Sequence, residues 1–177
     1  MMKAKVLATL AGLALAAPAL AQNDAPKETI TASFVGVDGT DIGTAHLSPV
    51  SGGGVLIDAE ISGLPADSWV AFHIHETGEC DPASGFKSAG GHFNPTGAAH
   101  GFLAGDGPHA GDMPNQHVEA DGTLRTQVLN TAVTLGAGET AIEGRAIVIH
   151  DGQDDYQSQP SGDAGSRIAC AVIGAST

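Results

Sequence analysis

From Thr29 onward the sequence consists of short β-type runs separated by Gly, Asp and Pro. Several runs alternate apolar and polar residues with a period of two, and no stretch shows a sustained apolar stripe with a period of 3.6. This pattern predicts an all-β sandwich or barrel. We find no repeat of fixed period and no second domain. The runs are TITASFVGVDG, GGGVLIDAEISGLP, SWVAFHIH, TLRTQVLNTAVTL, GRAIVIH and RIACAVIG.

The first 21 residues have the layout of a secretory signal peptide. Lys3 and Lys5 precede a short apolar stretch that ends before Pro18, and Ala19-Leu20-Ala21 is a small-residue cleavage signal. The stretch is too short for a membrane-spanning helix. We therefore expect export to the periplasm, with cleavage after Ala21.

The mature chain then divides into a tail and one domain. Residues 22–28 are polar and are expected to form a flexible tail, and residues 29–177 are long enough for a single core. The formal net charge of −13 becomes −15 once the two leader lysines are removed, leaving five basic against 20 acidic residues. Such an acidic surface argues against nucleic acid and against a membrane surface as partners.

The two cysteines, Cys80 and Cys170, favour one disulfide, because their number is even and the chain is exported. The alternative is two free thiols or two thiolate metal ligands. A disulfide here would close a loop of about 90 residues, which the chain-entropy model values at roughly 4 to 5 kcal/mol.

The segment 76–117 does not fit a compact β-domain, because it has 13 Gly or Pro in 42 positions and no convincing strand. An unstructured loop of this length needs a function or something that holds it in place. Its candidates for that task are Cys80, Lys87, His92, His100, His109 and Asp112.

Histidines recur in this segment and in the strand before it. In the preceding strand, period-two alternation directs Phe72 and Ile74 to one face and His73 and His75 to the other, so the two imidazoles can share a metal. In the loop, the spacing His92-x7-His100-x8-His109-x2-Asp112 supplies three imidazoles and a carboxylate, which suits a closed zinc site. His150 ends a later apolar strand, and Asp154 follows it.

Together these motifs resemble the copper/zinc superoxide dismutase family, over residues 33–174 and in the family's order. They are HIHE, AGGHFNP, GPHAGDMPN, IVIHDGQDD and GDAGSRIACAVIG. The resemblance implies a Greek-key β-sandwich, or flattened eight-stranded barrel, with long metal-binding loops. The short segment between His150 and Arg167, which contains no lysine, resembles the exported bacterial branch.

The resemblance also implies a role for each residue. His73, His75, His92 and His150 would hold copper, and His92, as a bridging imidazolate, would hold zinc together with His100, His109 and Asp112. Asp154 would hydrogen-bond one ligand of each metal, His73 and His100. Arg167 would receive the anion, positioned by a disulfide between Cys80 and Cys170, whereas His46 and His117 match no ligand position and are expected at the surface.

The implied activity converts superoxide to oxygen and hydrogen peroxide through Cu(II)/Cu(I) cycling, with structural zinc and with His92 exchanging a proton. Copper or zinc buffering without turnover is the alternative, but a storage protein has no need of Arg167. Zinc-dependent hydrolysis would require an open zinc position. Assembly as a monomer or a homodimer stays open.

The acidity of the chain raises the question of how an anion approaches the site. Lys27 is expected in the tail, and Arg125 and Arg145 in strands away from the ligands. Lys87, between Cys80 and His92, is therefore the residue that we expect to steer superoxide toward Arg167.

Overall fold

A computed structural model describes residue 1 and residues 28–174. The expected signal peptide and most of the expected tail lie outside the described residues. Eleven short elements make up the described chain. They are β1 (Ile30–Gly36), β2 (Asp41–Pro49), β3 (Val55–Ile61), β4 (Trp69–Val70), β5 (Phe72–His75), the 3-10 turns η1 (Pro82–Ser84) and η2 (Lys87–Ala89), β6 (Gln116–His117), β7 (Leu124–Asn130), β8 (Ala146–His150) and β9 (Arg167–Val172).

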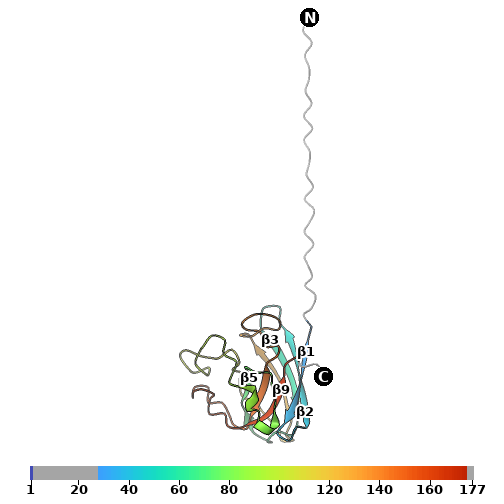
Figure 1. Ribbon diagram of the computed structural model, residues 1–177, viewed down its shortest axis with the longest axis vertical. Coiled ribbons are helices and arrows are strands. Elements are labelled where there is room, and N and C mark those ends of the chain that lie inside the picture. Colours follow the sequence, from blue (N-terminus) through green and yellow to red (C-terminus); the bar gives the residue numbers. More distant parts are fainter. Residues whose placement is uncertain (2–27, 175–177) are drawn as a thin grey trace.

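Seven strands form one curled antiparallel sheet in the order β5-β8-β9-β1-β2-β3-β7. The strands β4 and β6 form a separate two-stranded sheet. Figure 1 shows two long loops beside β5, on the side of the sheet away from β1 and β2. The all-β prediction is confirmed, and no described helix is long and apolar enough to cross a membrane.

The concave face of the sheet is filled by one hydrophobic core. Period-two alternation builds it: in β5, Phe72 and Ile74 point into the core, and in β8, Ile147 and Ile149 do the same. These four side chains are fully buried, and each contributes about 1.5 to 3 kcal/mol to folding by leaving water. The core therefore fixes which face of β5 and β8 is left for other side chains.

The opposite face of β5 and β8 is also buried, because loops cover it. A second, smaller cluster lies there, in which Phe86 and Ala89 of the loop pack on Ala146, Val148 and Cys170. The outward histidines of β5 are likewise fully buried. The sequence places them outside the barrel but does not reveal that they are shielded from water.

A disulfide between Cys80 and Cys170 ties this loop to β9. Its sequence separation is 90 residues, and Cys170 is fully buried. Ser88 adds two hydrogen bonds within the loop. Its hydroxyl accepts from the Asp81 N–H and donates to the Glu79 carbonyl, each at a distance of 2.9 Å. The predicted disulfide is thus present and closes the loop over the sheet.

Three local features differ from the sequence expectations. Strand β2 is absent from the expected runs because only Ala45 and Leu47 of its nine residues are buried. Its Gly43 lies so close to β3 that a Cβ there would be 2.3 Å from the Glu60 carbonyl oxygen. The expected run SWVAFHIH is divided between β4 and β5, and the segment 76–117 ends in the short strand β6.

Breaking the cross-link should destabilise the fold. We expect the double variant Cys80→Ser/Cys170→Ser to lose about 4 kcal/mol of stability, or about 10 °C in Tm, because the unfolded chain regains the closed loop's entropy. Thermal unfolding followed by circular dichroism measures this. Ser88→Ala, which removes loop hydrogen bonds but keeps the disulfide, is the matched control; an equal loss in both variants would assign the effect to loop packing.

Candidate metal centre

Three segments converge on the covered outer face of the sheet. The end of β5 supplies His73 and His75, and the end of β8 supplies His150. The loop after β5 is attached by isolated bridges that pair His75 with His92 and His73 with Asp112. Backbone pairing thus brings side chains that are far apart in sequence into one buried group.

The first cluster consists of four buried histidines whose ring nitrogens lie within 4.8 Å of one another: His73, His75, His92 and His150. The second has the same compactness and consists of His92, His100, His109 and Asp112. His92 belongs to both. Every ligand candidate that the sequence singled out is in one of these two clusters, and the ring centroids of His92 lie 4.1 Å from His73 and 5.5 Å from His109.

Hydrogen bonds to acceptors determine which nitrogen of each ring in the first cluster is free. His73 Nε2 lies 2.8 Å from Asp154 Oδ2, so Nε2 carries the proton, and Nδ1 has no partner among the described residues. His75 Nδ1 donates to the Gly90 carbonyl over 3.0 Å, which leaves its Nε2 unprotonated. This Nε2 faces His150 Nε2 at 3.4 Å.

The free nitrogens of the first cluster form a set that suits copper. His150 Nδ1 has a longer contact, 3.4 Å, to the Gly165 carbonyl, so its Nε2 is also a lone pair. Two facing lone pairs repel unless a cation lies between them. Neutral imidazole nitrogens are preferred ligands of copper, which agrees with the orphaned His73 Nδ1 and His92 Nε2 beside them.

The second cluster is organised around Asp112. Its Oδ1 lies 2.9, 3.1 and 3.4 Å from the Nδ1 atoms of His92, His100 and His109. Its Oδ2 accepts the backbone N–H groups of Gly101 and His109, each at 2.9 Å. One oxygen is thus held by the backbone while the other faces three imidazoles, a closed set of three nitrogens and one oxygen that suits zinc.

The pKa values of His73, His150 and Asp112 favour the protonation states that metal binding requires. Burial lowers the pKa of His73 to about 4 and that of His150 to about 3, so both rings are neutral near pH 7. Burial alone would raise the pKa of Asp112, but hydrogen bonds from His92 and Gly101 hold it well below its usual range. The carboxylate is therefore ionised.

Asp154 joins the two clusters. Its Oδ2 accepts from His73 and its Oδ1, at 2.9 Å, from His100 Nε2. Burial would raise its pKa, yet the hydrogen bonds from both imidazoles lower it to about 2. Asn115 holds the Asp154 backbone from both sides, accepting its N–H and donating to its carbonyl, each at 2.8 Å. Sequence reasoning did not identify Asn115, although the residue ends the motif GPHAGDMPN.

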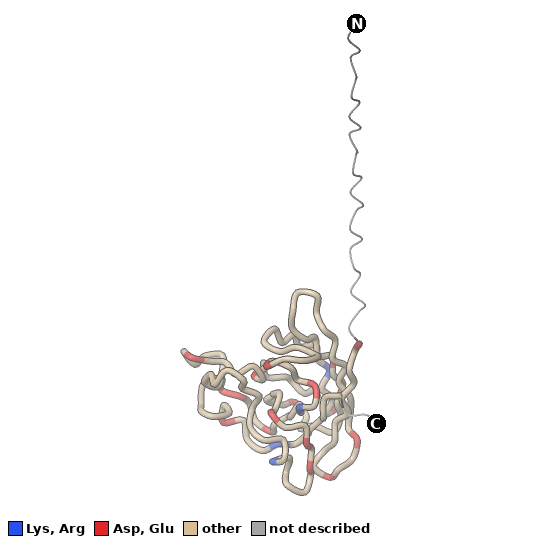
Figure 2. The backbone as a smooth tube through the Cα atoms, turned by 45° about the horizontal axis from the view of Figure 1, so that its top comes forward, with Lys and Arg blue, Asp and Glu red and all other residues tan. Residues whose placement is uncertain are grey.

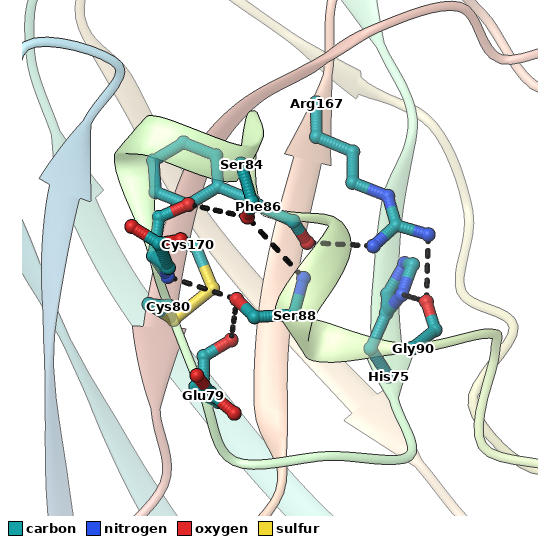
Figure 3. Close-up of a disulfide and its surroundings, with 10 residues drawn as sticks. His75, Glu79, Cys80, Ser84, Phe86, Ser88, Gly90, Arg167 and Cys170 are labelled. Carbon is teal, nitrogen blue, oxygen red and sulfur yellow. Dashed lines mark hydrogen bonds between the residues drawn. A yellow bond between two sulfur atoms is a disulfide. The ribbon is translucent and has the colours of Figure 1, made fainter.

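Arg167 opens β9 opposite His150 in the register. Its guanidinium donates to the carbonyls of Phe86 and Gly90, at 2.7 and 2.6 Å, and Figure 3 shows it beside His75, with the disulfide across the same loop. The loop carbonyls thus fix where the positive charge lies. No sequence pattern reveals such contacts, because they are made by the backbone.

Positive charge is scarce elsewhere in the described chain, and Figure 2 shows acidic residues spread along it with few basic ones. Arg125 is paired with Glu60 at 2.8 Å. The expectation that Arg145 lies in a strand away from the ligands is wrong: it precedes β8 and donates to the Glu76 carbonyl, one residue after His75, over 2.7 Å. Lys87 is exposed and lies in η2, within the loop that Arg167 contacts.

The two remaining histidines lie at the surface, as expected. His46 is exposed on β2, where its Nδ1 contacts the Thr31 hydroxyl at 3.1 Å. His117 is exposed on β6 and meets Trp69 edge-on, with ring centroids 5.1 Å apart. Neither belongs to a cluster that could hold a metal.

Comparisons with known proteins agree with this geometry. Residues 42–173 match the family described as copper/zinc superoxide dismutase. The chain is 52% identical over 146 residues to a Cu-Zn superoxide dismutase of Aquifex aeolicus, covering 80% of this chain and 84% of the relative. A superoxide dismutase-like protein of Bacillus subtilis has a solved structure with a TM-score of 0.76 and 35% identity, over 80% of this chain and 95% of that one. The Cu/Zn superoxide dismutase of Brucella abortus gives a TM-score of 0.68 at 27% identity, over 82% and 99% of the two chains.

The contacts of Asp154 predict how metal retention depends on it. Asp154→Asn keeps the shape but cannot accept from both imidazoles as a carboxylate does, so both rings lose orientation. We expect metal affinity to fall by roughly 10 to 100-fold. Competition with a chelator measures it, and Asp155→Asn, whose carboxylate binds only Gln157 and Ser158, is the matched control. Retention equal to that of the control would contradict the role of Asp154.

Proposed function

Because the chain belongs to the copper/zinc superoxide dismutase family, we propose that its two histidine clusters hold copper and zinc side by side and that Arg167 receives the superoxide anion. The activity of the chain is the conversion of superoxide to oxygen and hydrogen peroxide, and its cofactors are copper and zinc. Copper supplies the electron transfer by cycling between Cu(II) and Cu(I), whereas zinc has no redox chemistry. Metal storage without turnover is not favoured.

The ligand assignment that we propose follows from the free ring nitrogens. His73 Nδ1 and the Nε2 atoms of His75, His92 and His150 would hold copper. The Nδ1 atoms of His92, His100 and His109, with Asp112 Oδ1, would hold zinc. The observation that carries the proposal is the position of His92, which faces both clusters with different nitrogens.

His92 and Arg167 would carry out the chemistry that falls to the protein. Production of hydrogen peroxide consumes two protons for every two superoxide ions. His92 Nε2 is a buried lone pair, so it can hold one of these protons beside the substrate. Arg167 has no carboxylate partner among the described residues and keeps its full positive charge for an anion.

We also propose that the protein is exported and acts in the periplasm. The supporting features are the leader ending at Ala21 and the disulfide, which persists in oxidising compartments. Intact-mass measurement of the periplasmic protein would locate the cleavage. With a net charge of −15, the mature chain would avoid nucleic acid and anionic membranes and act as a monomer or a homodimer.

The shared position of His92 predicts a double loss. We expect His92→Ala to lower the occupancy of both metals and to abolish most superoxide consumption, because one side chain serves both sites. Metal analysis after dialysis, together with a superoxide assay of the reconstituted protein, measures this. His109→Ala is the control, since His109 belongs only to the second cluster and should affect mainly zinc. Normal copper and zinc occupancy in His92→Ala would refute the bridging assignment.

Lys87 is the residue that we propose for electrostatic steering. The described chain contains three other basic residues, of which Arg125 and Arg145 are engaged with Glu60 and with backbone carbonyls, and Arg167 is at the site. Lys87 makes no ion pair with any described residue and belongs to the loop that holds Arg167. Its ammonium is thus a free positive charge near the approach to Arg167.

Reversing this charge should slow superoxide capture in a salt-dependent way. Lys87→Glu changes the charge by two units, which at about 10 Å in water corresponds to about 0.8 kcal/mol, or roughly fourfold in kcat/KM. At physiological ionic strength the difference should shrink to under about twofold. Arg125→Glu makes the same change on β7, at the opposite edge of the sheet from β5, and is the control. Equal kcat/KM values for both variants at low salt would exclude steering by Lys87.

A further inference from the structure

We infer that Glu76 is a positioning residue. Its carboxylate orients both His75 and Arg167 by accepting a hydrogen bond from the peptide group between Gly90 and Gly91. This inference deepens the proposed function and rests on it. Glu76 directly follows His75, yet it belongs to neither metal cluster. Its side chain is exposed, so packing in the hydrophobic core does not account for its contact with the loop.

The Gly90–Gly91 peptide is bound on both of its sides. Its N–H, contributed by Gly91, donates to Glu76 Oε1 over 2.9 Å. Its carbonyl, contributed by Gly90, accepts from His75 Nδ1 at 3.0 Å and from Arg167 Nη2 at 2.6 Å (Figure 3). The N–H and C=O of a trans peptide point in opposite directions, so fixing the N–H also fixes the carbonyl. Glu76 therefore aims the acceptor that His75 and Arg167 share.

The backbone of Glu76 is itself fixed, which allows its side chain to act as a rigid support. The Glu76 N–H donates to the Gly91 carbonyl over 2.9 Å. The Glu76 carbonyl accepts from Arg145 Nη1 at 2.7 Å, and the Arg145 guanidinium lies 3.8 Å from the centre of the Phe93 ring. The backbone of Glu76 is thus held in place. Glu76 and Gly91 are joined by two hydrogen bonds, one from the Glu76 N–H to the Gly91 carbonyl and one from the Gly91 N–H to the Glu76 carboxylate.

Gly90 has the conformation that this arrangement requires. Its φ of 72° and ψ of −154° are accessible to glycine and not to other residues. A Cβ on Gly90 would lie 2.6 Å from Glu76 Oε1 and 2.8 Å from its Cγ. The carboxylate therefore packs against the bare Cα of Gly90 as well as bonding the next N–H. A peptide in so unusual a conformation needs contacts on both sides to remain there.

The contact has an electronic consequence. A carboxylate that accepts a peptide N–H polarises the peptide and strengthens the bonds that its carbonyl accepts. At His75 this favours the tautomer with a proton on Nδ1 and a lone pair on Nε2, the proposed copper ligand. At Arg167 it holds the guanidinium in place for the anion. The negative charge of Glu76 on its own would repel an anion, so the two effects have opposite signs.

Removing the Glu76 carboxylate should therefore weaken anion binding if the hydrogen bond matters more, and strengthen it if only the negative charge matters. Azide serves as the anion probe, and its dissociation constant is measured from its absorption spectrum with the copper-and-zinc-loaded protein. We expect Glu76→Ala to weaken azide binding about threefold or more, the net effect of one lost hydrogen bond, and Glu76→Gln, which keeps an acceptor oxygen, to recover at least part of it. The matched control is Glu79→Ala, because Glu79 has the same charge on the same loop but no side-chain hydrogen bond or ion pair with the described residues. It should leave azide affinity unchanged or slightly raise it.

A second measurement does not depend on the anion. Hydrogen exchange of the Gly91 amide, followed by NMR in the reduced, metal-loaded protein, should be faster in Glu76→Ala than in wild type and unchanged in Glu79→Ala. Azide affinity in Glu76→Ala equal to or above that in Glu79→Ala would overturn the inference. If wild-type protein bound copper but showed no azide binding, the assignment of Arg167 would fail instead, and Gly91 exchange would still decide whether Glu76 holds the peptide.

Discussion

The carboxylate of Asp154 is the contact on which the rest of the centre depends, because it joins three distant parts of the chain in one pair of hydrogen bonds. It connects the core strand β5 through His73 and the long loop through His100. Asp154 itself lies in a third segment, which follows β8, and Asn115 of the long loop binds its backbone. Burying a carboxylate is costly unless it is fully hydrogen-bonded, so the three segments have little freedom to move apart. Asp154 thereby holds one ring of each cluster, in addition to the link made by His92, which belongs to both.

Electrostatics explain how such a centre can exist in an acidic protein. Burial lowers the pKa values of His73, His75 and His150 and keeps these rings neutral, and hydrogen bonds keep the two carboxylates, Asp112 and Asp154, ionised. The two clusters of side chains therefore carry negative charge and favour divalent cations. Two such ions would outweigh the carboxylates, and Arg167 would add its positive charge to theirs. With both ions bound, the centre would be a region of positive charge on a chain whose formal net charge is −13.

The sequence was informative where side-chain chemistry carried the pattern. Period-two alternation separated Phe72 and Ile74 from His73 and His75, and the even number of cysteines predicted the disulfide, which the structure contains. The grouping of the ligand candidates was also foreseeable, because few other roles explain so many histidines in a glycine-rich loop. Family motifs supplied the remainder.

The contacts that the sequence could not reveal are those made by backbone groups and those between residues that only the fold brings together. The carbonyls of Phe86 and Gly90 hold Arg167, and a carbonyl has no residue-specific signal. Glu76 appears in the sequence as one more surface acid, since only the fold brings Gly91 to it. Arg145 was misplaced for a related reason: it precedes β8, and its contacts with Glu76 and Phe93 are made with the loop that follows β5.

The strand order has a consequence for the time at which the molecule can acquire its structure. Strand β9 is the last of the described strands, yet it lies inside the sheet between β8 and β1. A nascent polypeptide cannot join β1 to β8 until β9 has been synthesised, and β9 also brings Cys170 and Arg167. Contacts between residues so far apart in sequence form slowly. The sheet, the disulfide and the placement of Arg167 can therefore be completed only together, after residues 167–172 have been synthesised.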